Sequence, residues 1–303
     1  MKKYDTFIMG HISKDKNVFQ GKTVNETGGA VVYSSCSSYA IGHKTGILTK
    51  LSFRDKKRLE IFSIPKENII TLDSKNTTSI RNIYHTEDRE RRTCTALSIA
   101  DPFKISDIPD NIDSRIFHFA GLISGEFDNE MIKILHNRGK IALDVQGFLR
   151  AVGKNNEMIF RDWKEKKEYL PYIDYLKTDA AEAEIMTGVS ERKKAARILF
   201  SWGVKEIMIT HNKEVLLYNG KKAYTCPLKP RNLSGRTGRG DTCFSAYITE
   251  RKDKEIEKAL LFASALVSFK MEKPGPFKGT RDKVEDYIKK LVIPKQSCTK
   301  FAL

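Results

Sequence analysis

A glycine-rich stretch in the last quarter of the chain has the residue types and spacing of a site for chemistry on an anion. It reads Gly235-Arg236-Thr237-Gly238-Arg239-Gly240-Asp241-Thr242-Cys243 and precedes apolar residues with helical spacing. Glycine permits the tight turn that points successive amide N–H groups at one place. At a helix N-terminus, these amides and the helix dipole bind an anion. Asp241, in the first turn of the predicted helix, could then accept a proton from a hydroxyl group that attacks a bound phosphoryl group.

The same nine residues also suit a plain surface turn in which Asp241 caps the helix. Two common phosphate-binding motifs are missing from the sequence. It has no Gly-x-x-x-x-Gly-Lys-Ser/Thr stretch, which argues against a P-loop NTPase. It has no Gly-x-Gly-x-x-Gly after the first predicted strand, which argues against a nicotinamide-dependent enzyme.

The elements that would position this turn alternate between strands and helices. Apolar patterns predict helices over residues 30–41, 131–137 and 190–202, with Ser190 opening the last of these, and strands over residues 6–9, 44–50, 115–121, 141–145 and 206–210. This alternation indicates an α/β fold with a parallel sheet covered on both faces.

One region departs from the alternation. Residues 77–85 and 91–97 predict an antiparallel hairpin with a turn over 86–90, which together with residues 12–23 would form a small β lid. Lids of this kind close over reacting groups and exclude water. With no linker or repeat in the sequence, we expect residues 1–303 to form a single domain, with lid segments at about 11–27 and 73–100.

The net charge of +16, from 54 basic and 38 acidic residues, implies an attraction to anions. A non-catalytic protein that binds nucleic acid or another anion is therefore an alternative to an enzyme. Most basic residues are interleaved with acids, as in Lys164-Glu165-Lys166-Lys167-Glu168, which is typical of a solvated surface, and no nucleic-acid-binding motif occurs. Nucleic acid is therefore an improbable partner.

The sequence gives no sign of a membrane or an oxidising compartment. No apolar run reaches the length of a membrane span, and the first residues lack the apolar segment of a secretory signal. The five cysteines include no Cys-x-x-Cys pair. We therefore expect a cytoplasmic protein with reduced cysteines.

The glycine-rich stretch resembles the second signature of the ribokinase-like (PfkB) carbohydrate kinases, Asp-Thr-x-Gly-Ala-Gly-Asp. Matches to the family's other segments occur in order along the chain: an acid at Asp15, the glycine pair Gly28-Gly29, and Lys177-Thr178-Asp179-Ala180-Ala181-Glu182 where the family has Asn-x-x-Glu. The resemblance covers nearly the whole chain. It implies a three-layer α/β/α ribokinase-like fold with a mostly parallel central sheet and a small β lid, and an ATP-dependent kinase that phosphorylates a hydroxyl group.

The resemblance also implies roles for single residues. Asp241 matches the catalytic base, and Gly238, Arg239 and Gly240 match the anion hole. The matches for substrate binding are Asp15, Gly28 and Gly29. Those for nucleotide binding are Asp179, Glu182, Thr210 and Gly275, with Asp179 and Glu182 holding Mg²⁺ through water. A monovalent cation and a homodimer paired through the lids are further expectations from the family.

The chain departs from the family pattern at several positions. The leading Asp of the signature is Gly235, its alanine is Arg239, and the asparagine of Asn-x-x-Glu is Asp179. Residues 210–214 lack the family's glycines, which puts backbone contact with a nucleotide there in doubt. Arg236 and Arg239 could replace that contact as phosphate ligands, or they could be solvated.

Several segments resemble a narrower branch, the myo-inositol kinases: Gly10-His11-Ile12-Ser13-Lys14-Asp15, Ala100-Asp101-Pro102-Phe103 and Asp144-Val145-Gln146-Gly147-Phe148-Leu149-Arg150. Gln146 follows a predicted strand end, where α/β enzymes bind ligands, and is either a substrate ligand or a loop cap. Asp144 and Arg150 are interpreted as a local pair. Another sugar or a nucleoside is the alternative substrate, because Tyr33 or Phe148 could stack on a base.

Overall fold

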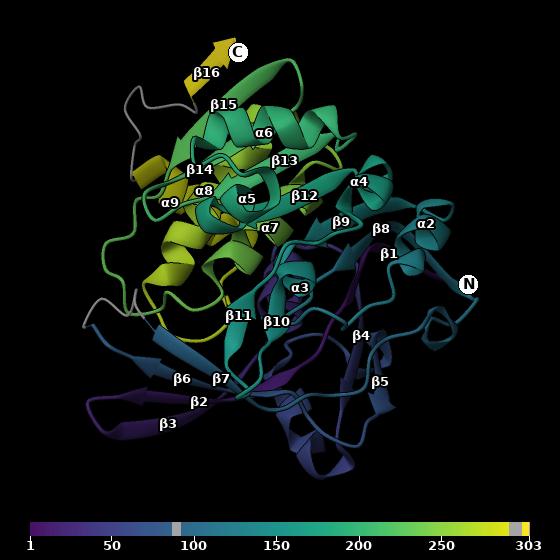
Figure 1. Cartoon of the computed structure of the whole chain (residues 1–303). Coiled ribbons are helices and arrows are strands. Elements are labelled where there is room, and N and C mark those ends of the chain that lie inside the picture. The colour runs from purple at the N-terminus through teal and green to yellow at the C-terminus, as the bar shows by residue number, and fades with distance from the viewer. Residues whose placement is uncertain (87–91, 291–298, 303) are drawn as a thin grey trace.

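The computed structural model describes residues 1–86, 92–290 and 299–302 of the chain (Figure 1). Its main sheet has the strand order β16-β15-β14-β13-β12-β9-β8-β1-β4-β5. The strands from β13 to β5 in this order are parallel, which confirms the predicted mostly parallel sheet. They span Lys2–Met9 (β1), Thr45–Leu51 (β4), Ile69–Asp73 (β5), Ile112–Phe119 (β8), Lys140–Asp144 (β9), Tyr175–Asp179 (β12) and Glu206–Thr210 (β13).

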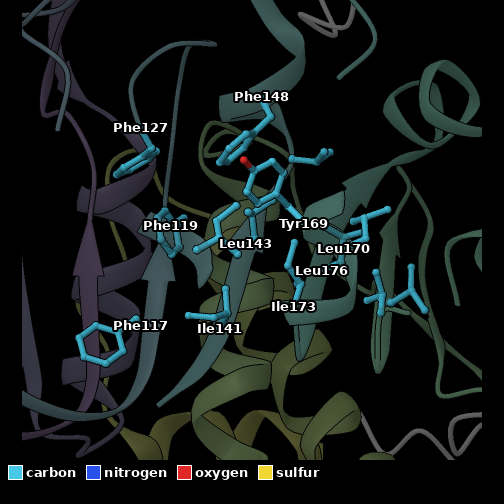
Figure 2. Packing of buried hydrophobic residues seen from close by; sticks show 14 of the residues in the cluster. Phe117, Phe119, Phe127, Ile141, Leu143, Phe148, Tyr169, Leu170, Ile173 and Leu176 are labelled. Carbon is cyan, nitrogen blue, oxygen red and sulfur yellow. The ribbon is translucent and has the colours of Figure 1, made fainter. Parts of the chain in front are cut away.

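Helices cover both faces of this sheet, because side chains alternate along each strand and both faces are apolar. Phe7 and Met9 of β1 pack in one cluster with side chains of α2, α5 and α6, whereas Ile8 packs with α1. Met208 of β13 packs with α7 and α8 on the same side as α1. Figure 2 shows the first of these layers, where Phe117, Ile141 and Leu176 of neighbouring strands point into the same core. The three-layer α/β/α architecture is confirmed.

The predicted helices are present at residues 30–40, 130–136, 192–201 and 239–250, and the described residues form further helices that were not predicted. Together, these α-helices span Ala30–Ala40 (α1), Glu130–His136 (α2), Gln146–Leu149 (α3), Lys166–Tyr169 (α4), Ala180–Thr187 (α5), Arg192–Ser201 (α6), Arg239–Glu250 (α7), Ile256–Met271 (α8) and Arg281–Lys290 (α9). Helix α6 is capped at Glu191, so Ser190 does not open it as predicted. Within the described ranges, none of the helices has the length and apolarity to cross a membrane.

A second, four-stranded sheet stands apart from the main one, at the lower left of Figure 1. It has the order β3-β2-β6-β7 and consists of Ser13–Phe19 (β2), Lys22–Gly28 (β3), Ser79–Tyr84 (β6) and Arg92–Ser98 (β7). The antiparallel pairing of β6 with β7 and the partnership with residues 12–23 agree with the predicted β lid. Most of the predicted turn, residues 87–90, lies outside the described residues.

Two antiparallel additions were not predicted. Glu214–Tyr218 (β14), Lys222–Pro227 (β15) and Thr299–Ala302 (β16) extend the main sheet beyond β13. Arg150–Val152 (β10) and Met158–Phe160 (β11) form a hairpin, whose Asn156 carbonyl accepts a hydrogen bond of 2.8 Å from the Ala96 N–H of β7. This hairpin therefore ties the lid to the segment that follows β9.

The loops that leave β8 and β9 touch at two glycines. A Cβ on Gly147 would lie 2.7 Å from the Cα of Gly121, and a Cβ on Gly121 would lie 2.8 Å from the Cα of Gly147. The close approach holds Gln146 and the start of α3 against the end of β8. Only glycine at both positions permits it.

We expect Gly147→Ala to lower the free energy of unfolding by about 1–3 kcal/mol, the usual cost of overpacking. The added methyl group must separate the two loops, because both neighbours are backbone atoms. Urea unfolding followed by circular dichroism measures the change. An unfolding midpoint equal to that of the unmodified chain would contradict the tight contact.

Candidate functional site

The glycine-rich turn leads into α7 in the way the sequence predicts. Gly238 has φ of 74° and is the N-cap of α7, and a Cβ there would lie 2.1 Å from the ring of Tyr33. Gly235 is equally constrained, because a Cβ on it would lie 1.8 Å from the carbonyl oxygen of Lys273. This explains the departure from the family pattern at Gly235: the backbone after α8 fills the space that an aspartate side chain would need.

Lys270, in the last turn of α8, supports the turn from below. Its ammonium donates a 2.6 Å hydrogen bond to the Gly235 carbonyl and a second hydrogen bond to that of Thr237. It also lies 4.9 Å from the centre of the Tyr33 ring. Burial lowers the pKa of Lys270 to about 8, with the Asp241 carboxylate opposing the shift. Because the carbonyls are held from this side, the amide N–H groups of the turn can face the other.

Lys177 of β12 places a second buried ammonium under the turn. Its Nζ lies 3.0 Å and 2.9 Å from the two carboxylate oxygens of Asp144, which ends β9. A Cβ on Gly240 would be 3.3 Å from this Nζ, so the ammonium lies directly beside the anion hole. Burial alone would lower the pKa of Lys177, but the carboxylates of Asp144, Glu182 and Asp241 raise it above its usual range.

Asp241 lies half-buried in the first turn of α7. Its backbone carbonyl accepts a hydrogen bond of 3.3 Å from the Ser34 hydroxyl of α1. Burial raises the pKa of Asp241 to about 7; Lys177 opposes the increase, and the neighbouring Asp144 adds to it. A carboxylate with a pKa near neutrality is well matched to removing a proton from a hydroxyl group.

The predicted substrate residues Asp15, Gly28 and Gly29 lie together at the base of the lid. A Cβ on Gly28 would be 2.9 Å from Asp15 Oδ2, and Gly29 has φ of 110° and caps α1. Burial raises the pKa of Asp15 to about 6, although the Ser13 hydroxyl and Arg150 oppose the shift. Asp15 Oδ1 is buried and makes no hydrogen bond among the described residues. This oxygen is available to a hydroxyl group of a ligand.

Tyr33 lies near the carboxylates of both Asp15 and Asp241. Burial raises its pKa, and the carboxylates of Glu26, Asp241 and Asp15 add to the shift. Asp15 on the lid and Asp241 on α7 therefore lie on the same side of the molecule, around one tyrosine. Gln146 is the first residue of α3, two residues after Asp144. Its backbone N–H donates a hydrogen bond of 3.1 Å to Asp144 Oδ1. The half-buried Gln146 side chain is thus held near the same charged cluster.

Asp179 and Glu182 form a capping box at the start of α5. Asp179 Oδ1 accepts from the Glu182 N–H at 2.8 Å, and Glu182 Oε2 accepts from the Asp179 N–H at 2.8 Å. Burial raises the pKa of Glu182 to about 8, against the opposing effect of Lys177. The described residues contain no cluster of three or more His, Cys, Asp or Glu side chains suited to a metal. Each of these two carboxylates has one oxygen that takes no part in the capping box. These oxygens are suited to bind the water ligands of a Mg²⁺ ion that also contacts the phosphates of a ligand.

The remaining predicted residues lie around the turn at different distances. Thr210 pairs in register with Asp179, and its Oγ1 would be 4.0 Å from a Cβ on Gly240. The Arg239 side chain extends away from the turn and donates a hydrogen bond of 3.0 Å to Asn212 Oδ1. Arg236 is half-buried within the turn, and Gly275 has φ of 83° in the loop after α8. Thr210 is therefore part of the turn's surroundings, whereas a Cβ on Gly275 would meet open space.

Two features of the site differ from the sequence interpretation. Asp144 does not form a local pair with Arg150: it pairs with Lys177, and Arg150 lies near Cys94, Arg92 and Asp15. Lys177 and Lys270 were not assigned roles. Both carried a signal, because Lys177 interrupts an apolar strand and Lys270 is spaced three, four and seven residues from apolar positions of α8. A lysine on a buried face needs a partner.

The profile of the pfkB family carbohydrate kinases matches residues 21–282 of this chain. A cytidine kinase from Thermococcus kodakarensis is 28% identical over 261 residues, covering 80% of this chain and 87% of that protein. A ribokinase from Arabidopsis thaliana, solved with ribose and ATP, is 16% identical with a TM-score of 0.74, covering 95% of this chain and 99% of that chain, and supports the fold alone.

Two solved structures are more similar. A pyrophosphate-dependent kinase of the ribokinase family, in complex with a pyrophosphate analog and myo-inositol, is 36% identical over 93% of this chain and 99% of that chain, with a TM-score of 0.84. A pyrophosphate-dependent myo-inositol-1 kinase converted into a myo-inositol-3 kinase is 35% identical over 94% of this chain and 99% of that chain, with a TM-score of 0.83.

We expect Lys270→Met to weaken the binding of inorganic phosphate at the turn roughly 10- to 100-fold, which is the scale of one or two lost hydrogen bonds from a charged group. Without the ammonium, the carbonyls of Gly235 and Thr237 lose their donor and the turn loses its shape. Isothermal titration calorimetry measures the change. Lys273→Met is the matched control, since the Lys273 side chain is exposed three residues away. Equal affinities in both variants would contradict the supporting role.

Proposed function

The chain belongs to the PfkB family of carbohydrate kinases, and on that premise we propose that it transfers a phosphoryl group from inorganic pyrophosphate to a hydroxyl group of myo-inositol. The observation that carries the proposal is the position of Asp241. It lies in the first turn of α7, directly after the glycine turn, and the ammonium groups of Lys177 and Lys270 both lie against that turn. A carboxylate that can act as a base is thus held beside a positively charged site for phosphate.

The reaction needs little from the chain beyond position and charge. Asp241 accepts the proton of the acceptor hydroxyl while that oxygen attacks the phosphorus atom. The amide N–H groups of residues 238–240 and the Lys177 ammonium stabilise the charge on the transferred group. When bound near Asp179 and Glu182, Mg²⁺ would neutralise further charge on the phosphates. As the new O–P bond forms, the bridging P–O bond of pyrophosphate breaks, and inorganic phosphate leaves roughly in line with the attacking oxygen.

Pyrophosphate, rather than the ATP expected from the sequence, is favoured by the surroundings of the turn. The loop between β13 and β14 has no glycine, and Arg239 extends over it to Asn212. This loop therefore has a cationic side chain against it, whereas the glycine-rich backbone contact for a nucleoside is missing. The two similar structures named above are both of pyrophosphate-dependent enzymes.

A polyhydroxylated acceptor is favoured over a nucleoside. Asp15 offers a buried carboxylate oxygen to hydroxyl groups, and Gln146 adds an amide nearby. The two aromatic rings that could have stacked on a base already pack against other groups of the chain. Tyr33 lies between Gly238 and Lys270, and Phe148 packs 4.5 Å from Trp163, centre to centre. A cytidine kinase remains the second candidate because of the 28% identical relative.

The test is a matrix of two donors and a panel of acceptors. Pyrophosphate or ATP is incubated with Mg²⁺ and with myo-inositol, other inositol isomers, ribose or cytidine, and ³¹P NMR follows each new phosphate ester. We expect an ester from pyrophosphate and myo-inositol, and none without acceptor. An ester formed from ATP and cytidine, with pyrophosphate inert, would establish the second candidate instead.

We expect Asp241→Asn to lower turnover at least roughly 100-fold, the usual contribution of a positioned base, and to keep the affinity for pyrophosphate. Circular dichroism and calorimetry serve as controls for folding and binding. Turnover equal to that of the unmodified enzyme would remove Asp241 from the reaction.

The same base predicts the pH dependence of the reaction. The carboxylate form is the active one, and its pKa is raised to about 7. Below pH 7 the group becomes protonated, so turnover should fall with decreasing pH, and above pH 7 it should level off. A turnover profile measured from pH 5 to 9 tests this; the residual activity of Asp241→Asn should lack the step near 7.

A further inference from the structure

A cavity of about 540 Å³ lies at the opposite edge of the main sheet from Asp241. Lys140 and Tyr175, the first residues of β9 and β12, line it together with Thr6 of β1 and Arg115 of β8. Thr249 and Arg251 at the C-terminal end of α7 close another side. Ligand sites in proteins have volumes of roughly 300–1,000 Å³, so this space is large enough for a small organic molecule.

The cavity wall is positively charged after its ion pairs are considered. Asp174 pairs with Lys205 at 2.7 Å, and Asp5 pairs with Lys252 at 2.7 Å. Arg251 pairs at 2.8 Å with Glu206. Arg115 and Lys140 have no carboxylate partner among the described residues. The Nζ of Lys140 donates a hydrogen bond of 3.4 Å to the Tyr175 hydroxyl, which is uncharged. Two positive charges therefore face the cavity without compensation.

Two buried polar atoms of the wall also lack partners. Thr6 is fully buried, and its hydroxyl makes no hydrogen bond to any described residue. His43 is 8% exposed, and its Nδ1 lies 3.8 Å from Asp5 Oδ2, which is too long for a hydrogen bond. A buried donor without an acceptor costs about 1–3 kcal/mol, so such groups normally meet a ligand or water. The Thr6 hydroxyl can donate to an anionic oxygen, and His43 Nδ1 can do so when it carries the proton, with Nε2 of the same ring 3.7 Å from Glu250 Oε1.

We propose that this cavity binds a small organic phosphate ester. The two uncompensated cations would pair with the phosphate group, and the Thr6 hydroxyl and the His43 ring could donate to its oxygens or to hydroxyl groups of the ester. The remaining volume accommodates a short organic part. The site is separate from the proposed catalytic one: it lies at the other end of α7, where Arg251 is about 15 Å along the helix axis from Asp241. An occupant would contact the last turn of the helix whose first turn carries Asp241.

Glycerol 3-phosphate is the probe. Inorganic phosphate is titrated separately, and the difference between the two affinities shows whether the organic part of the ester contributes to binding. Isothermal titration calorimetry counts the sites in the unmodified protein, in Arg115→Ala/Lys140→Ala, and in Arg54→Ala/Lys57→Ala. The last variant is the matched control, because it also removes one exposed arginine and one exposed lysine, from a 3₁₀ helix that does not line the cavity. ¹⁵N NMR of the histidine rings reports on His43 directly.

We expect the cavity variant to bind one glycerol 3-phosphate fewer than the control and the unmodified protein, and the His43 signals to shift with ligand in these two alone. Thr6→Val should weaken the same binding event without lowering the stability of the ligand-free protein. Equal site numbers in all three proteins, or binding that leaves the His43 signals unchanged, would overturn the proposal. Neither readout depends on turnover, so the result is independent of the proposed kinase reaction.

Discussion

The buried ammonium of Lys177 is the interaction on which the site depends. Three carboxylates, those of Asp144, Glu182 and Asp241, raise its pKa, and each comes from a different element: β9, α5 and α7. Removing a charge from water is costly unless an opposite charge replaces the lost hydration. The buried cation and the buried carboxylates therefore stabilise one another. Their attraction holds β9, α5 and α7 in place around the glycine turn.

The two buried lysines of the site behave differently because their partners differ. Lys177 faces carboxylates, which overcome the effect of burial and keep it charged. Lys270 donates to two carbonyl groups, which carry only partial charges, so burial prevails and lowers its pKa to about 8. The first lysine supplies charge to the anion site, and the second mainly fixes the shape of the backbone. A sequence with lysine at both positions does not by itself distinguish these tasks.

The parts that could be predicted from the sequence are those with local causes. The strand Glu206–Thr210 and the helix that starts after Gly29 follow from apolar periodicity and glycine, and the glycine turn at the start of α7 follows from its own residues. Strands β14 and β15 and the β10–β11 pair are hairpins between neighbouring segments, and Asn219-Gly220 between β14 and β15 is a local hairpin signal that the sequence-based prediction missed. Strand β16 pairs with the distant β15, and no local pattern in the sequence predicts such a pairing. The partner of Asp144 was misassigned for the same reason: Lys177 is 33 residues away and becomes its neighbour only through the parallel pairing of β9 with β12.

Helix α7 is buried along its whole length after Asp241, since every side chain from Thr242 to Glu250 is buried. It packs against α1 and α8 and contacts β12, so turning or sliding it would open the core on that face of the sheet. The base is thus part of the least deformable region of the molecule. The strands of the lid, with β3 exposed along most of its length, are the only described elements of the site that could travel far at small energetic cost. In the proposed reaction, the acceptor is therefore brought to a stationary Asp241, and the specificity of the reaction depends on how the lid positions the acceptor.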